Sequence, residues 1–362
     1  MLPKLLIRSL ILAVSLTLLP TVAQAGKNRI VELKGEAKIK LAGAINYQPV
    51  FKGMTLVLGD ILLPNEGAEV IVNCSDGKRK QAQAGVPSGL KAICPGAKST
   101  DPRGGSPIFI NLLDGDFIAR TLLLANESLL SWSPVSGATR YRVKVMANNE
   151  VIWEKTVEGT SVRYQGEPLN PKFKFYKLVV EAMDGNKLSS YRLELTKAEK
   201  VIVESVQNDI KNIDTESVSE EAKALMLIDV YWEEYDNIKS GFLFAAATPL
   251  EKLLQSGNQT PVIHRLLGDI YLRLGRWQEA EEKYKKVILL AQSEKNHFEI
   301  AAAQAGLAHV AVIKGNFSEA RKFLLEAKQG YQIAGDGQQV DLIQGWLEKL
   351  ESKLSQKLQV RQ

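Results

Sequence analysis

The spacing of apolar residues changes once along the chain, close to residue 197. Before that point, apolar and polar residues alternate in short runs, as at Ala37, Ile39 and Leu41, which flank two lysines. This period of two is typical of strands that bury one face. After it, apolar residues such as Ala198 and Val201 recur at helical intervals, which predicts amphipathic helices. The fold class is therefore predicted to be multidomain, with all-β units first and an all-α unit at the C-terminus.

Residues 26–124 are predicted to form the first β unit, with a linker near its end. Strands are expected at Met54–Leu58, Ile61–Leu63 and Glu69–Cys74, with a hairpin turn at Asp76-Gly77. The linker corresponds to a stretch rich in Gly, Pro and Ser at 97–107. The two apolar runs that follow it, up to residue 125, either complete this unit or form a separate bridge.

Glycines recur at the expected turns of this unit, at Gly35, Gly53, Gly59, Gly67 and Gly77. We expect these glycines to need a positive φ, so the motif specifies a fold and not an active site. Their pattern resembles the FecR-type β domain of bacterial envelope proteins. The resemblance implies a periplasmic domain that takes part in signalling or surface assembly.

Residues 125–197 are predicted to form a second β unit. Trp132 lies in an early strand-like run, and Tyr141, Val143 and Val145 alternate with polar residues in the next. About seven such runs in so short a segment suit a small sandwich. The motifs resemble the immunoglobulin and fibronectin type III domains, in which the early Trp is a core residue.

The helical part, 198–362, contains a motif that occurs twice. Gly275–Ala280 (GRWQEA) reappears forty positions later as Gly315–Ala320 (GNFSEA), and each copy joins two helix-period apolar runs. A repeated pair of amphipathic helices joined by a glycine turn predicts a solenoid. Clear repeats are expected at 261–294 and 301–334.

Additional helices are expected on both sides of these repeats. Start signals for helices occur at Ser217, at Thr248-Pro249 and at Thr260-Pro261. The segment 217–257 is expected to form an irregular leading repeat. At the other end, 336–358 carries one apolar stripe and one charged face, as expected for a helix that caps a solenoid.

The first repeat resembles the tetratricopeptide repeat, with Leu267, Gly268, Tyr271, Ala280 and Tyr284 at its signature positions. Small residues at such positions let the two helices of a repeat approach closely. The resemblance implies a concave surface that binds a protein or peptide.

The positions that line this surface in the resembled family define a candidate partner-binding groove here. In that groove, Arg265 could hold a carboxylate of a partner through its fork of donors. Alternatively, Arg265 and Asp269 pair with each other on the helix surface. The candidate groove residues are Arg265, Asp269, Leu272, Ala305 and His309.

The N-terminus has the features of a signal peptide over residues 1–25. Lys4 and Arg8 precede the apolar run Leu10–Leu19, and Ala23-Gln24-Ala25 supplies small residues for cleavage. The run is short for a membrane span, although an uncleaved anchor is the alternative. We expect an exported protein, periplasmic or extracellular in a bacterial envelope, with no transmembrane span after signal cleavage.

The chain contains two cysteines, Cys74 and Cys94. In an exported protein such a pair is expected to form a disulfide, with two buried free thiols as the alternative. Closing a loop of about 20 residues would contribute on the order of 3 kcal/mol by restricting the unfolded chain.

Side chains suited to catalysis or metal binding are scarce. The histidines His264, His297 and His309 all lie in the helical part, so the β units cannot build a Ser-His-Asp or Cys-His site by themselves. Their spacing to acids and cysteines fits no metal set, and no glycine-rich phosphate loop occurs. We therefore expect no enzyme activity, no cofactor and no metal. A net charge of +5 without a concentrated basic face argues against nucleic acid as a partner.

These expectations favour a non-catalytic scaffold or adaptor of the cell envelope that binds a protein or peptide partner through the solenoid. Two alternatives remain. One is a glycan- or peptidoglycan-binding protein that uses its β units, where Trp153 could stack on a sugar or could simply be buried. The other is a FecR-like component of envelope signalling.

Overall fold

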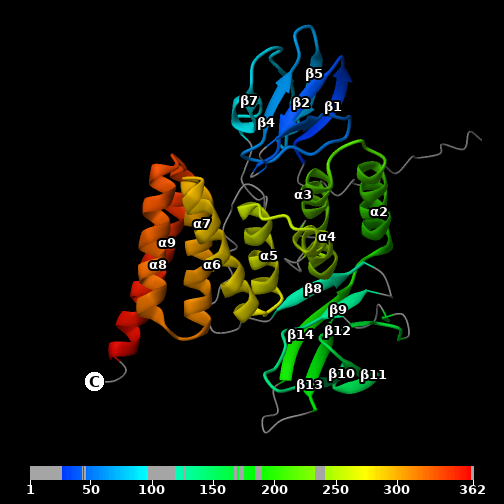
Figure 1. The fold of residues 1–362 in the computed structure, drawn as a ribbon, viewed down its shortest axis with the longest axis vertical. Coiled ribbons are helices and arrows are strands. Elements are labelled where there is room, and N and C mark those ends of the chain that lie inside the picture. Colours follow the sequence, from blue (N-terminus) through cyan, green and yellow to red (C-terminus); the bar gives the residue numbers. More distant parts are fainter. Residues whose placement is uncertain are drawn as a thin grey trace, which may run out of the picture.

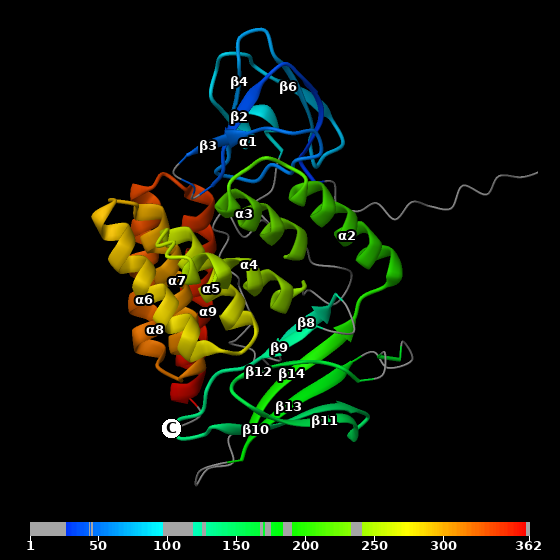
Figure 2. The same ribbon diagram turned by 45° about the vertical axis from the view of Figure 1, so that its right-hand side comes forward.

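A computed structural model shows two β units separated in space by the helices (Figures 1 and 2). The first β unit lies above helices α2–α5 in Figure 1 and the second β unit lies below them. The predicted signal peptide and linker lie outside the described residues. The structure describes residues 27–42, 44, 46–96, 119–124, 128–166, 169–170, 175–183, 190–232 and 241–359.

The first β unit consists of two small antiparallel sheets and a short helix. One sheet has the order β1-β5-β6 and the other the order β3-β2-β4-β7. The alternation predicted around Ile39 is confirmed, because Ala37, Ile39 and Leu41 are all buried. The elements are β1 (Arg29–Lys34), β2 (Ala37–Lys40), β3 (Tyr47–Pro49), β4 (Ile61–Pro64), β5 (Glu69–Asn73), β6 (Arg79–Ala82), β7 (Ser88–Gly89) and α1 (Leu90–Ile93).

The turn glycines of this unit adopt the backbone conformation expected from the sequence. Their φ angles lie between 77° and 96°, in the left-handed region that favours glycine. At Gly59 a side chain would also collide with its surroundings, since an added Cβ would lie 2.9 Å from the Cβ of Ala42. The five residues are Gly35, Gly53, Gly59, Gly67 and Gly77.

The strand predicted at Met54–Leu58 is wrong, because this segment makes only an isolated bridge between Thr55 and Arg29. The adjacent residues Leu56 and Val57 are both buried, so burial does not alternate here as it does in a strand with one wet face. The carboxylate of Asp60 accepts hydrogen bonds from the backbone N–H groups of Val57 (2.9 Å) and Ala42 (2.7 Å). A side chain thus supplies hydrogen bonds that a neighbouring strand would otherwise provide.

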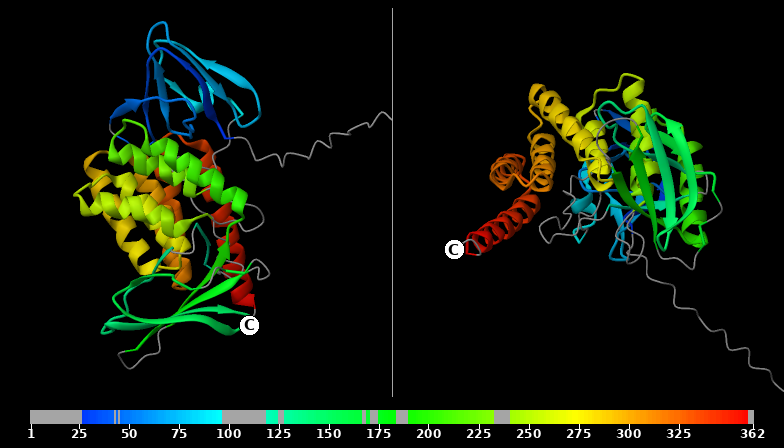
Figure 3. Two further views of the ribbon diagram at one scale, coloured as in Figure 1. Left: turned by 90° about the vertical axis from the view of Figure 1, so that its right-hand side faces the viewer. Right: turned by 90° about the horizontal axis from the view of Figure 1, so that it is seen from below.

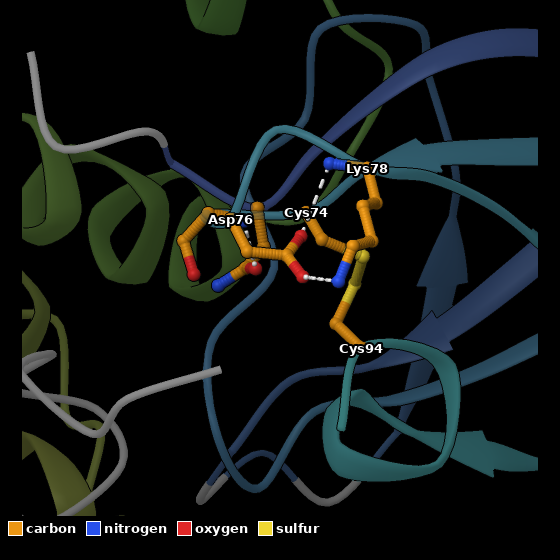
Figure 4. The surroundings of a disulfide bond; sticks show 6 residues. Cys74, Asp76, Lys78 and Cys94 are labelled. Atoms are coloured by element: carbon orange, nitrogen blue, oxygen red, sulfur yellow. Dashed lines mark hydrogen bonds and ion pairs between the residues drawn. A yellow bond between two sulfur atoms is a disulfide. The ribbon is translucent and has the colours of Figure 1, made fainter. Parts of the chain in front are cut away.

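The predicted disulfide joins Cys74 and Cys94, with their Cα atoms 5.7 Å apart. It connects the end of β5 to the residue that follows α1 (Figure 4). The adjacent turn is held by the carboxylate of Asp76, which accepts a hydrogen bond from the Lys78 backbone at 3.0 Å. The disulfide therefore fastens the last segment of the first β unit to its sheets.

The second β unit contains a five-stranded sheet, in the order β11-β10-β13-β14-β8, and the pair β12-β9. The prediction that Trp132 lies in its core is confirmed, with Trp132 1% exposed and edge-on to Tyr141 at 5.7 Å between ring centroids. Val143 and Val145 point into the same core. The strands are β8 (Arg120–Leu123), β9 (Leu129–Ser131), β10 (Arg140–Ala147), β11 (Glu150–Glu158), β12 (Ser161–Arg163), β13 (Tyr176–Ala182) and β14 (Ser190–Lys197).

The boundary between the two β units differs from the one predicted between residues 124 and 125, because of strand β8. It lies before that boundary, yet it pairs in parallel with β14 and so contributes to the second β unit. Arg120 Nε donates to Glu194 Oε2 on β14 at 2.6 Å. The apolar run around β8 does not alternate, so its sequence alone could not assign it to either sheet.

The helical part forms consecutive helices, each of which packs on the next. From α5 to α9 the helices follow one another in a curved layer (Figure 3, right), as expected for a solenoid of helix pairs. The glycine turns at Gly275, Gly315 and Gly335 have φ angles of 77°, 77° and 74°. The helices are α2 (Lys200–Asp214), α3 (Glu220–Tyr231), α4 (Leu243–Gln255), α5 (Pro261–Arg273), α6 (Trp277–Ser293), α7 (His297–Ile313), α8 (Phe317–Ile333) and α9 (Gly337–Gln359).

Two of the three predicted start signals are displaced. Helix α3 is capped by Ser219, whose hydroxyl accepts from the Ala222 backbone at 3.1 Å, and not by Ser217. Helix α4 begins at Leu243, so Pro249 lies within it. The third signal is confirmed, because α5 begins at Pro261. Among the described helices, none combines the length and the apolar character that a membrane crossing requires.

Candidate functional site

The two repeats are joined by an aromatic ring between two glycines. Tyr284 of α6 lies between Gly268 of α5 and Gly306 of α7, and it is fully buried. A Cβ added at Gly268 would lie 2.7 Å from Cε1 of this ring, and one at Gly306 would lie closer still. Real side chains do not pack at such distances, so both glycines allow the close approach of the helices. Gly268 is among the signature residues predicted from the sequence, whereas Gly306 is not.

The hydroxyl of Tyr284 belongs to a buried polar cluster that also contains two of the predicted groove residues, Arg265 and Asp269. It donates to Asp269 Oδ1 at 2.8 Å, and Arg265 Nη1 donates to Asp269 Oδ2 at 3.1 Å. Arg265 Nε also donates to Glu299 Oε2 of α7 at 2.7 Å. The predicted pairing of Arg265 with Asp269 is therefore present, but in the interior, since Arg265 is 1% exposed.

Glu299 is not among the residues predicted from the sequence, although the sequence contains a signal for it. Glu299 is the acidic residue in the first turn of α7, and Asn296 caps that helix by accepting from its backbone N–H at 3.2 Å. A carboxylate buried on a helix as apolar as α7 needs a positively charged or hydrogen-bonding partner, because burying an unpaired charge is costly. That partner is Arg265, which connects the first repeat to the second.

Burial dominates the acid–base behaviour of this cluster. It raises the pKa of Asp269 to about 6, although Arg265 and the Tyr284 hydroxyl both favour the ionised carboxylate. Burial opposes the charge of Arg265 as well, but the carboxylates of Glu299 and Asp269 more than compensate and raise its pKa. The cluster is therefore a charged connection within the core, and it contains one carboxyl group, that of Asp269, with a raised pKa.

The remaining predicted groove residues are also buried. Leu272 is 1% exposed, Ala305 0% and His309 1%. The His309 ring lies edge-on to Trp346 of α9, with ring centroids 4.2 Å apart, and burial lowers the pKa of His309 to about 3. The five predicted residues thus form no open groove; the structure brings Arg265 and Asp269 together and places the others elsewhere in the core.

The first helices of the repeats are buried nearly all round. Every residue of α5 from Pro261 to Leu272 is buried, and so is most of α7. Accessible apolar side chains lie instead on the second helices, where Leu289 is 64% exposed on α6, and Leu325 and Ile333 are 42% and 59% exposed on α8. Within the described repeats, the large exposed apolar side chains therefore lie on α6 and α8 and not on α5 or α7.

The second β unit is attached to the start of α6 through a network of polar side chains. The buried Arg276 donates from Nη1 to Ser131 Oγ at 2.9 Å and from Nε to Glu279 Oε2 at 2.9 Å. Glu279 also accepts from Ser133, and the Arg276 guanidinium lies 4.1 Å from the ring centroid of Tyr271. These contacts fix the first repeat on the second β unit.

The other candidate residues show no site of their own. Trp153 is partly buried and lies edge-on to Tyr164 at 5.2 Å between ring centroids. Within the described ranges, no group of three His, Cys, Asp or Glu residues could hold a metal ion. A cavity of about 40 Å³ between the first β unit and α2–α3, beside Arg29 and Asp209, has room only for a few water molecules.

Residues 259–332 match the tetratricopeptide repeat family. The match spans α5 to α8, the two helix pairs that contain the buried cluster. A search of curated proteins found no match to the chain.

Proposed function

We propose that this protein is a non-catalytic scaffold or adaptor of the bacterial cell envelope that binds a protein partner through its helical repeats. The observation that carries the proposal is the tetratricopeptide match over 259–332, which coincides with two complete helix pairs. Stacked helix pairs of this kind present extended surfaces that suit protein–protein interaction.

The accessible face of α6 and α8 is the part of the repeats that supports partner binding best. Leu289 and Leu325 are exposed there, and exposed apolar side chains at such a surface favour contact with another protein. The residues first expected to line a groove serve packing, because a partner cannot reach side chains that are 0–9% exposed.

The envelope location rests on two features of the first quarter of the chain. Lys4 and Arg8 precede an apolar run and small residues, the pattern of an export signal. The Cys74–Cys94 disulfide suits an oxidising compartment outside the cytoplasm.

A capture experiment with matched variants tests the proposal. The bait is the chain from residue 26 onward, because the helices are attached to the second β unit and should not be separated from it. Leu289→Lys combined with Leu325→Lys alters the exposed face of the repeats. Val201→Lys, a change at a 66% exposed residue of α2, is the control.

We expect an envelope protein to be retained by the wild type and by the Val201 control, and to be lost with the double variant. Equal retention by all three baits, or no retained protein, would contradict binding through α6 and α8.

The alternative of glycan binding by the β units can be separated from this proposal in the same preparation. Sedimentation of the bait with purified cell wall would favour it, particularly if Trp153→Ala abolished the sedimentation. FecR-like signalling would instead require that the captured partner be a membrane protein.

A further inference from the structure

The buried cluster of the two repeats contains more negative than positive groups. The guanidinium of Arg265 faces the carboxylates of Asp269 and Glu299, at 3.1 and 2.7 Å. The side chains of Arg265 and Glu299 are 1% and 3% exposed, and that of Asp269 is 12% exposed. Two carboxylates that share one cation in a medium of low dielectric constant repel each other, so ionising both is costly.

Groups from four helices act on the cluster. Helix α5 supplies Arg265 and Asp269, α6 supplies the Tyr284 hydroxyl and α7 supplies Glu299. The electrostatic environment also includes Tyr331 of α8 and, beyond it, Asp336. These additional groups are neutral or acidic, so they do not offset the second carboxylate.

The two carboxyl groups are not equivalent. Glu299 lies in the first turn of α7, where the helix dipole favours a negative charge, and it accepts the shorter bond from Arg265. Asp269 lies in the second half of α5, where the dipole gives no such support. A single proton therefore belongs on Asp269, in agreement with its raised pKa of about 6.

We propose that this cluster is a proton-sensitive connection: in mildly acidic surroundings Asp269 takes up one proton, and the Arg265–Glu299 pair between the repeats then becomes stronger. With Asp269 neutral, Arg265 no longer divides its charge between two carboxylates. The neutral carboxyl still accepts from Tyr284 or donates to an oxygen, so the cluster stays hydrogen-bonded.

The sign of the effect on stability follows from linkage. Because the folded state binds this proton more tightly than the unfolded chain does, Asp269 makes the repeats more stable as the pH falls from above 7 towards 5. An ordinary exposed or ion-paired acid does the opposite or nothing. A region that gains stability on mild acidification is therefore a specific signature of this cluster.

The test compares thermal unfolding of the whole protein, followed by the circular dichroism signal of its helices, at about pH 5 and about pH 7.5. Asp269→Asn keeps the shape of the side chain and removes its charge. Glu282→Gln, at an exposed acid of α6, is the matched control. For each protein, the change in Tm from the higher to the lower pH is measured. We expect this change to be more positive, by about 3 °C or more, in the wild type and the control than in Asp269→Asn.

Tyr284→Phe provides a second measurement if Asp269→Asn does not fold. It removes a hydrogen bond that favours the ionised carboxylate, so the midpoint of the pH dependence should move to higher pH. Parallel pH profiles for the wild type and Asp269→Asn would overturn the proposal, as would an unchanged midpoint in Tyr284→Phe.

Discussion

The two β units contact the helices in different ways. The second β unit is joined to them through buried groups: the N–H of Leu243 donates to the Thr121 hydroxyl at 3.0 Å, and Arg276 reaches Ser131. The first β unit makes longer and more exposed polar contacts. Arg29 donates to Asp209 at 3.3 and 3.4 Å, and the Ser219 backbone donates to Gln48 at 3.3 Å.

This difference separates the chain into a central body and an attached unit. Shorter hydrogen bonds that involve the buried side chains of Thr121 and Arg276 couple the second β unit to the helices, so these two parts should unfold together. The first β unit has its own sheets and a disulfide that stabilises it without the helices. The order of units along the sequence does not show this, because the second β unit is adjacent in sequence both to the first β unit and to the helices.

The strongest test of the coupling is Arg276→Ala. This variant leaves Glu279 without its cationic partner and removes the contact to Ser131. We therefore expect the free energy of unfolding to fall by about 3–5 kcal/mol, as when one partner of a buried ion pair is removed. The loss should appear in one transition that contains both the helices and the second β unit, measured by urea unfolding with circular dichroism and tryptophan fluorescence. The control is Arg321→Ala, whose pair with Glu351 is half exposed and should cost below about 1 kcal/mol. Equal effects of the two variants would refute the coupling.

Loss of the disulfide should affect only the attached unit. Replacing Cys74 and Cys94 by serine should destabilise the first β unit by about 3 kcal/mol. None of the five tryptophans lies in residues 27–96, so the midpoint followed by tryptophan fluorescence should not change. Proteolysis within 27–96 should become faster, and a shifted fluorescence midpoint would argue against an independent unit.

Within the central body, close packing at Tyr284 can be tested with a pair of glycine variants. Gly306→Ala forces a methyl group into the Tyr284 ring and should cost about 1–3 kcal/mol. Gly345→Ala, in α9, meets no atom within 4 Å and should stabilise its helix by up to about 1 kcal/mol. Thermal unfolding should therefore shift in opposite directions, and shifts in the same direction would contradict the interlocked repeats.

The smallest effect on stability is expected at the contact between the first β unit and α2. In Arg29→Ala the lost pair with Asp209 is partly exposed, with side chains 34% and 20% accessible, so stability should change by less than about 1 kcal/mol. Small-angle scattering should nevertheless show a broader distribution of distances within the molecule as the first β unit becomes freer. An unchanged scattering profile would mean that apolar contacts alone fix this junction.

Local patterns in the sequence were sufficient for most of the fold. Alternation around Ile39 and Val143 identified strands, positive-φ glycines identified turns, and Thr260-Pro261 identified the start of α5. These signals act over a few residues, so neighbours in sequence determine them. The start of α4 was not predicted correctly, because this helix continues through Pro249, whereas proline is usually excluded from the interior of a helix.

The candidate site depended on contacts that are distant in the sequence. Arg265 has the same spacing to Asp269 whether it lies on a surface or in a core, and its burial depends on Glu299, 34 positions away. Likewise, only the neighbouring helix shows that Gly306 faces Tyr284. Residue type and spacing could thus place side chains on a helix, but could not show what packs on that helix.

Hydrogen exchange of the whole protein in increasing sub-denaturing urea, read by mass spectrometry, tests the central claim most directly. We expect the amides of β10 and β13 to open at the same free energy as those of α5 and α6, and the amides of β1 and β5 to open in a separate step. If the strands of the second β unit instead opened independently of α5 and α6, the division into a central body and an attached unit would be wrong.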